Sequence, residues 1–180
     1  VLSNVFMFFK SKGQINHLQS YLNFTQSFFK DKINNNQDWT LKDRYYDVYF
    51  QNEIHIQIWL QNKEKIDKLL EEFKEVLKTK KIANTQLVSR IYLAFIELLI
   101  ISNELKTALE FLVEFFYLLK KNKNSINYVE GEVYSIIANS LIGNQDVSEN
   151  QTINLTRKIK RNNINMGKDL AILFELIQNS

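Results

Sequence analysis

The chain has 180 residues, of which 45% are hydrophobic and 24% are charged, and its formal net charge is +3 at pH 7. This composition predicts one globular domain over residues 1–180 and excludes a chain that is disordered throughout. The small net charge favours neither nucleic acid nor an anionic membrane as a partner. Cysteine is absent, which excludes disulfides and thiolate nucleophiles and is compatible with the cytoplasm.

Long helices are predicted by what the chain lacks. Proline is absent and glycine occurs only four times, so the residues that punctuate β-rich folds are scarce. The longest mainly apolar stretch, Ile91–Ile101, is shorter than the roughly 20 residues of a membrane span. We therefore expect an all-α fold without a membrane segment.

The N-terminal part has a loose helical pattern. One helix, ending before an Asn34–Asn36 loop, is predicted by Leu18, Tyr21, Leu22, Phe28 and Phe29, and a second by Leu41, Tyr45, Val48 and Tyr49. The run Ile54–Leu60 alternates as a strand would. Because no glycine turn or partner strand adjoins this run, we interpret it as helix. Residues 1–40 carry the least regular pattern.

The middle of the chain predicts three consecutive helices. The first spans Lys63–Lys80 and has one apolar stripe at helical spacing: Ile66, Leu69, Leu70, Phe73, Val76 and Leu77. Asn84 and Thr85 offer caps for a second helix that continues to Ser102, and a third extends to about Lys121. The second and third are apolar on nearly all sides, and their short connection predicts antiparallel packing.

The C-terminal part predicts three further helices. One ends near Gly143, a glycine expected just after a helix terminus. Ser148 is predicted to cap the next, and Gly167 precedes the last, whose apolar face holds Leu170, Leu173, Phe174 and Ile177.

Consecutive helical hairpins are the pattern of solenoid proteins. The tetratricopeptide pattern places Tyr92, Phe95 and Leu99 at the large positions and Ala108 at the small position where two helices touch. A second unit puts Ser148 at the small position, and its spacing from Ala108 exceeds the standard repeat of about 34 residues. We therefore predict antiparallel helix hairpins stacked as an irregular tetratricopeptide-like solenoid.

No residue pattern indicates catalysis, a metal or a cofactor. His17 and His55 are the two histidines, and their spacing matches no metal-binding motif. There is no glycine-rich phosphate loop. The basic cluster Arg157–Arg161 is interpreted as an exposed helix face in preference to a phosphate contact. We therefore expect a protein that is not an enzyme.

Candidate binding residues are the polar side chains that interrupt the apolar helices. A solenoid groove is lined in this way, and an asparagine amide supplies both a donor and an acceptor to a peptide backbone. The alternative is that each residue belongs to an ordinary exposed face. Peptide-binding positions are predicted at Asn52, His55, Trp59, Arg90, Glu97, Glu132, Ser135 and Asn139.

A family resemblance covers Leu69–Asn179. It is carried by the segments Leu87–Leu93, Leu99–Ser102 and Ala108–Leu112, followed by Leu118-Leu-Lys, Asn127-Tyr-Val-Glu130, Tyr134 and Leu141-Ile-Gly143. In these segments the chain resembles the C-terminal domain of Rgg-type transcriptional regulators, which belong among the tetratricopeptide-like pheromone receptors.

The resemblance implies an effector domain that forms a homodimer and binds a short signalling peptide in a concave groove. DNA would be bound only through an attached helix-turn-helix domain, for which residues 1–40 show no pattern. The chain would then be a fragment of a longer regulator. The alternative is a helical-repeat scaffold or assembly subunit that binds a protein partner.

Overall fold

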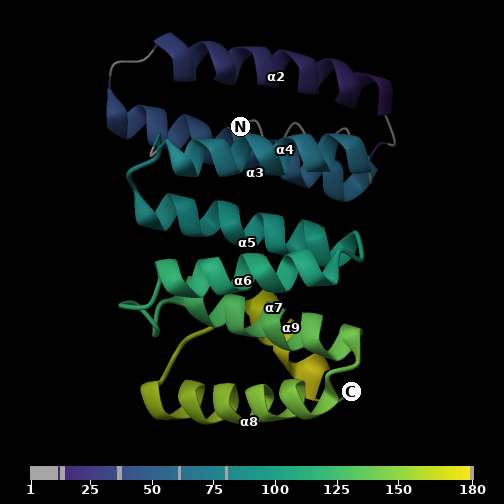
Figure 1. The fold of residues 1–180 in the computed structure, drawn as a ribbon, viewed down its shortest axis with the longest axis vertical. Helices are drawn as coiled ribbons and strands as arrows, with labels where there is room; N and C mark the ends of the chain where they lie inside the picture. The colour runs from purple at the N-terminus through teal and green to yellow at the C-terminus, as the bar shows by residue number, and fades with distance from the viewer. Residues whose placement is uncertain (1–11, 13–14, 36–37, 61, 80, 179–180) are drawn as a thin grey trace. The chain divides into compact units, whose positions relative to one another are not determined.

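A computed structural model describes residues 12, 15–35, 38–60, 62–79 and 81–178 (Figure 1). In these ranges the chain forms eight helices and no strand, which confirms the all-α prediction. The helices are α2 (Ile15–Asn35), α3 (Trp39–Leu60), α4 (Lys63–Lys78), α5 (Thr85–Ile101), α6 (Leu105–Leu118), α7 (Ile126–Ile142), α8 (Gln145–Asn162) and α9 (Lys168–Gln178). None of these helices is both long enough and apolar enough to cross a membrane.

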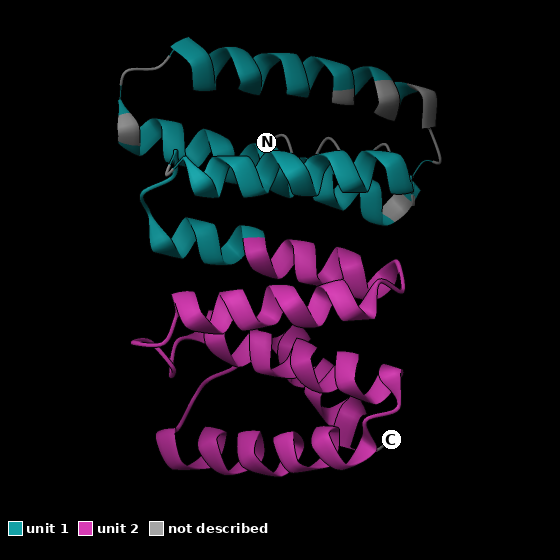
Figure 2. Cartoon of the chain, viewed as in Figure 1, with its two compact units in different colours: residues 1–91 teal, residues 92–180 magenta. Residues whose placement is uncertain are grey.

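The chain divides into two compact units, Val1–Ile91 and Tyr92–Ser180 (Figure 2). The first holds α2, α3, α4 and the beginning of α5, and the second holds the rest of α5 and α6 to α9. The single domain and the stacked solenoid therefore stay predictions.

The core of the first unit is aromatic. Phe50 of α3 is fully buried, and its ring centroid lies 5.2 Å from that of Phe73 on α4 in an edge-to-face arrangement. Two hydrogen bonds join neighbouring helices: Tyr49 Oη donates to Glu72 Oε2 at 2.8 Å, and Gln26 Nε2 donates to Glu53 Oε2 at 2.6 Å. Apolar packing and part-buried hydrogen bonds thus hold α2, α3 and α4 together.

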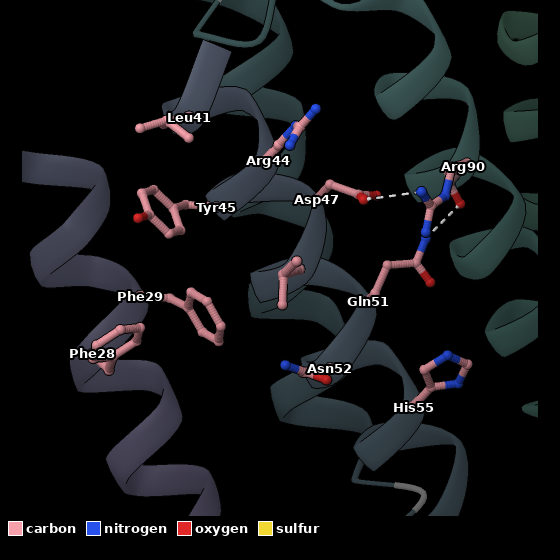
Figure 3. Close-up of a pocket in the computed structure, with 11 residues that line it drawn as sticks. Phe28, Phe29, Leu41, Arg44, Tyr45, Asp47, Gln51, Asn52, His55 and Arg90 are labelled. Atoms are coloured by element: carbon pink, nitrogen blue, oxygen red, sulfur yellow. Dashed lines mark hydrogen bonds and ion pairs between the residues drawn. The ribbon is translucent and has the colours of Figure 1, made fainter. Parts of the chain in front are cut away.

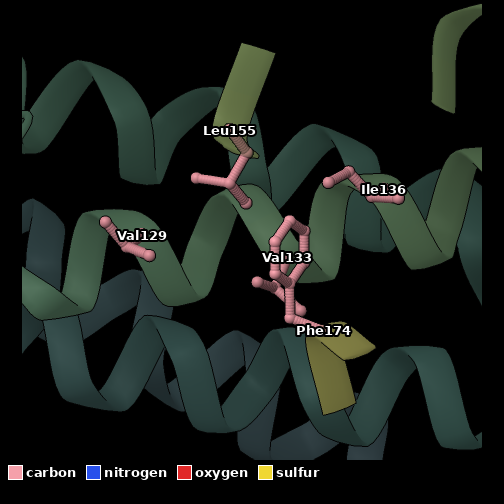
Figure 4. Close-up of a cluster of buried hydrophobic side chains, with 5 residues drawn as sticks. All are labelled: Val129, Val133, Ile136, Leu155 and Phe174. Atoms are coloured by element: carbon pink, nitrogen blue, oxygen red, sulfur yellow. The ribbon is translucent and has the colours of Figure 1, made fainter. Parts of the chain in front are cut away.

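The second unit has two apolar layers. The ring of Phe111 on α6 lies 5.7 Å from that of Tyr92 and 6.1 Å from that of Phe95, both on α5. On the other side of α7 a buried cluster joins three helices, as Figure 4 shows. Its members are Val129, Val133, Ile136, Leu155 and Phe174.

Several predicted helix boundaries are confirmed. Asn84 Oδ1 accepts hydrogen bonds from the backbone N–H groups of Gln86 and Leu87 at the start of α5. Gly143 ends α7 with φ of 91°, the left-handed conformation that glycine adopts without steric cost. The run Ile54–Leu60 belongs to α3 and is helical, as interpreted.

Three details of the prediction are wrong. Ser148 does not cap α8, because that helix begins at Gln145; its hydroxyl instead donates to the Gln145 carbonyl oxygen within the first turn. Helix α2 does not end before Asn34 but continues through Asn35. Helix α6 ends at Leu118, earlier than about Lys121, because the backbone turns at Leu119.

Candidate functional site

The first unit contains an open cavity of about 630 Å³ over one face of α3, which we call the α3 cavity (Figure 3). Helix α2 contributes one wall, and Arg90 of α5 lies on the opposite side. The apolar lining consists of Phe28, Phe29, Leu41, Tyr45 and Val48. The polar lining consists of Arg44, Asp47, Gln51, Asn52, His55 and Arg90.

Helical periodicity explains why α3 supplies most of this lining. Leu41, Tyr45, Val48, Asn52 and His55 are spaced by three or four residues, so they share one face of the helix. Phe50 and Ile54, two apolar core residues of α3, lie on the opposite side of the helix and are buried. One helix therefore closes the core with one face and forms the cavity floor with the other.

Asp47 is the most deeply buried charged residue of the α3 cavity. Its side chain is 5% exposed, and its Oδ2 atom lies 3.4 Å from Nη1 of Arg90. Burial raises the pKa of the Asp47 carboxyl group, while the charge of Arg90 and a hydrogen bond from Gln51 lower it. Gln51 also donates to the Arg90 carbonyl oxygen at 3.0 Å, so it fixes α3 against the start of α5.

Two buried polar atoms of this cavity lack hydrogen-bond partners: Asp47 Oδ1 and Asn52 Nδ2. Nearly all buried polar atoms in folded proteins are hydrogen-bonded, and an unsatisfied one costs about 1–3 kcal/mol. Asp47 offers an acceptor and Asn52 a donor. A ligand that supplied the complementary groups would remove this cost.

The second unit has a smaller cavity of about 300 Å³ next to α7 and α8. Glu132 Oε2 forms a 2.6 Å ion pair with Lys158 Nζ, which also lies 4.4 Å from the ring centroid of Tyr128. Gln151 Nε2 donates to Ser135 Oγ at 3.0 Å. Four polar side chains of this cavity are therefore bonded in pairs, whereas two buried polar atoms of the α3 cavity have no partner.

The structure places the predicted binding residues in different surroundings. Asn52, His55 and Arg90 line the α3 cavity, whereas Glu132 and Ser135 line the smaller cavity. Asn139 is buried beside Ser135, where Nδ2 donates to the Ser135 carbonyl oxygen at 2.9 Å and Oδ1 accepts from Asn144 at 3.2 Å. Both polar atoms of the Asn139 amide therefore form hydrogen bonds within the protein.

Glu97 lies in neither cavity. It is half-buried on α5, and its negative charge, after burial itself, contributes to the raised pKa of Tyr134. The side chain of Trp59 lies outside the described residues. Three of the predicted residues, Asn52, His55 and Arg90, therefore lie together in the α3 cavity.

No protein-family model, curated protein or solved structure matches this chain. The resemblance to Rgg-type regulators therefore stays a prediction. Among the described residues, no three histidine, aspartate or glutamate side chains gather as they would around a metal ion.

We expect Lys158→Met to lower the free energy of unfolding by about 1 kcal/mol at pH 7, because Glu132 then keeps a half-buried charge without its partner. Burial already raises the pKa of Glu132, and Lys158 lowers it. A carboxyl group with a raised folded-state pKa destabilises the protein as pH rises through the window above its unfolded pKa. The deficit of the variant should therefore shrink as pH falls toward about 4, the unfolded value.

Urea unfolding at pH 4 and pH 7 measures this difference. Lys160→Met is the matched control, because Lys160 is exposed on the same helix. Equal losses for Lys158→Met at both pH values would show that lost packing on Tyr128, and not the charge of Glu132, is the cause.

Proposed function

We propose that the chain is a non-enzymatic binding module whose α3 cavity holds a short segment of another polypeptide. One observation carries the proposal: solvent-exposed apolar side chains lie beside buried polar atoms that have no partner. Ligand sites typically combine an apolar lining with a few placed polar groups. The α3 cavity has both.

The apolar part would bind large hydrophobic side chains. Phe28, Leu41 and Val48 are 38%, 41% and 37% exposed, although each lines the cavity next to the buried Phe29. Removing such surface from water contributes about 25 cal/mol per Å². This gain makes a segment rich in leucine, isoleucine or phenylalanine the favoured occupant.

The polar part would bind the backbone of that segment. A peptide unit presents one N–H donor and one C=O acceptor, and the cavity offers an unpartnered acceptor on Asp47 and an unpartnered donor on Asn52. The floor from Leu41 to His55 spans about 21 Å at 1.5 Å per helical residue. An extended peptide of about six or seven residues has this length.

The biological setting of this module is a second step of the proposal. The resemblance to Rgg-type regulators supports an effector domain that senses a signalling peptide, dimerises and reaches DNA through an attached domain. The lack of cysteine supports the cytoplasm as its compartment. We adopt this setting as the first candidate.

The second candidate is a helical scaffold for protein assembly. Helix α6 exposes Val113 and Tyr117 at 70% and 71%, and these residues are four positions apart on one helix face. Neither lines the α3 cavity. Light scattering of a Tyr117→Ser variant tests this face: loss of a dimer or of a larger assembly would favour a role in association.

Peptide binding is tested with seven-residue peptides rich in leucine, isoleucine and phenylalanine, carrying a C-terminal fluorophore. We expect the best of them to raise the melting temperature, because a ligand of the native state stabilises it. Val48→Asp should weaken their binding at least tenfold by placing a charge on the apolar floor.

Val113→Asp is the matched control, because it makes the same change at an exposed valine that does not line the α3 cavity. Fluorescence anisotropy gives both affinities. Equal weakening by the two substitutions, or no binding by any peptide of the pool, would contradict the proposed function.

A further inference from the structure

A second opening adjoins the α3 cavity within the first unit. This space of about 790 Å³ shares Arg44, Asp47, Val48 and Arg90 with the α3 cavity and extends to Asp43 and the start of α5. We call it the carboxylate cavity, because Asp43 and Asp47 both line it. Nothing in the apolar patterning of the sequence indicated it.

The two carboxylates are buried and incompletely satisfied. Asp43 and Asp47 are each 5% exposed, and the Oδ1 atom of each lacks a hydrogen-bond partner. They are four residues apart on α3, a spacing that puts side chains on the same helix face with Cβ atoms about 5–6 Å apart. Both carboxylates therefore lie along one side of the carboxylate cavity.

The remaining carboxylate oxygens are already engaged. Asp43 Oδ2 accepts from the backbone N–H groups of Ala83 at 3.0 Å and Asn84 at 2.8 Å, just before α5. Asp47 Oδ2 pairs with Arg90. These contacts hold both side chains in place, and the buried Oδ1 atom of each carboxylate has no hydrogen-bond partner.

The chemistry of the missing partner follows from these acceptors. An ammonium group is compact, positively charged and carries three N–H donors, so it complements a pair of carboxylate acceptors. A calcium ion needs six to eight oxygen ligands, and no third acidic residue or histidine joins this pair among the described residues.

Arg44 and Arg90 also line the carboxylate cavity, and their positive charges repel a bound cation. The side chain of Arg90 is half-exposed and pairs with Asp47, and Arg44 is exposed. Solvent screens the repulsion between exposed charges, whereas buried carboxylate oxygens are screened much less. Solvent therefore weakens the repulsion between these arginines and a bound ammonium group.

We propose that the carboxylate cavity binds the free amino end of the peptide that occupies the α3 cavity, with its ammonium group between Asp43 and Asp47. This inference rests on the proposed function. Because the two cavities share four lining residues, the first side chains after a chain end there reach Val48 and the apolar floor. A lysine side chain would instead separate the backbone from the carboxylates by four methylene groups.

The test uses the best-binding peptide of the pool in three forms: a free amino end, an acetylated amino end, and an acetylated end with lysine as the first residue. All keep the C-terminal fluorophore, and binding is measured by fluorescence anisotropy at pH 6.5, where the α-amino group is protonated. We expect acetylation to weaken binding of the peptide to the wild-type protein about tenfold. The acetylated peptide with an N-terminal lysine should bind as weakly as the acetylated peptide without it.

Asp43→Asn should bring the ratio of the free and acetylated affinities close to one, while the affinity for the acetylated form changes little, because Asp43 lines the carboxylate cavity and not the α3 cavity. A merely structural role of Asp43 would weaken both forms alike. Asp67→Asn is the matched control, because Asp67 is exposed on α4 and lines neither cavity. The Asp67→Asn variant should have the same ratio of free to acetylated affinities as the wild-type protein.

Three outcomes of these binding measurements would contradict the inference. Equal affinities for free and acetylated peptides, still weakened by Val48→Asp, would refute the ammonium site and leave the proposed function standing. Full rescue by the lysine form would refute the chain end as the source of the ammonium group. If no peptide of the pool binds, the inference fails together with the proposed function.

Discussion

Replacing Phe50 by alanine should lower the free energy of unfolding of the first unit by about 4 kcal/mol, within the range of 3–5 kcal/mol typical of buried phenylalanine. Phe50 has no exposed surface, and its ring lies 5.1 Å from that of Tyr49 and 5.2 Å from that of Phe73. The substitution removes these aromatic contacts and leaves a cavity between α3 and α4.

Phe24→Ala is the matched control for Phe50→Ala. Phe24 is 62% exposed on α2, so the same truncation there removes little buried surface and should cost less than about 1 kcal/mol. Urea unfolding, with hydrogen exchange of the α3 and α4 amides, measures both effects. Similar losses for the two variants would contradict an aromatic core centred on Phe50.

Replacing Gly131 by alanine is expected to cost about 2 kcal/mol, although this change normally stabilises a helix interior by about 1 kcal/mol. A Cβ atom at this position of α7 would overlap with Cε1 of Phe115, because the two carbon atoms would be closer than non-bonded atoms approach in folded proteins. Phe115 is fully buried on α6, so its ring has no free space to move into. The steric cost therefore exceeds the gain in helix propensity.

Gly167→Ala is the control for Gly131→Ala, because no atom lies within 4 Å of a Cβ built there. It should be neutral or slightly stabilising. A second variant, Phe115→Leu with Gly131→Ala, should lose less than the sum of the two single changes, since the smaller side chain makes room for the methyl group. Additive losses would show that the contact with Phe115 is not the cause.

The helices were predictable because their determinants are local. The stripe from Ile66 to Val76 follows the helical period, and the structure buries it on α4. Asn84 and Gly143 marked helix ends for reasons that depend on one or two residues. Ser148 misled the prediction, because serine is also tolerated inside the first turn, and only the packing around α8 buries it there.

The candidate site was predictable only in part. Asn52, His55 and Arg90 were found as polar residues at helical spacing, and they do line one cavity. Glu132 and Ser135 have the same kind of spacing but bond to Lys158 and Gln151. Periodicity places a side chain on a helix face, but it does not show which neighbours that face meets.

The sequence by itself determined the helical class, the approximate ends of the helices and the expectation of a binding role, because composition, caps and periodicity act within a few residues. Only the tertiary structure decided that Asp43 and Asp47 are buried with an unpartnered oxygen each. Burial and hydrogen-bond satisfaction depend on elements distant in sequence, here α2 and the start of α5 against α3. The physical reason is that a side chain's partners are set by packing between helices.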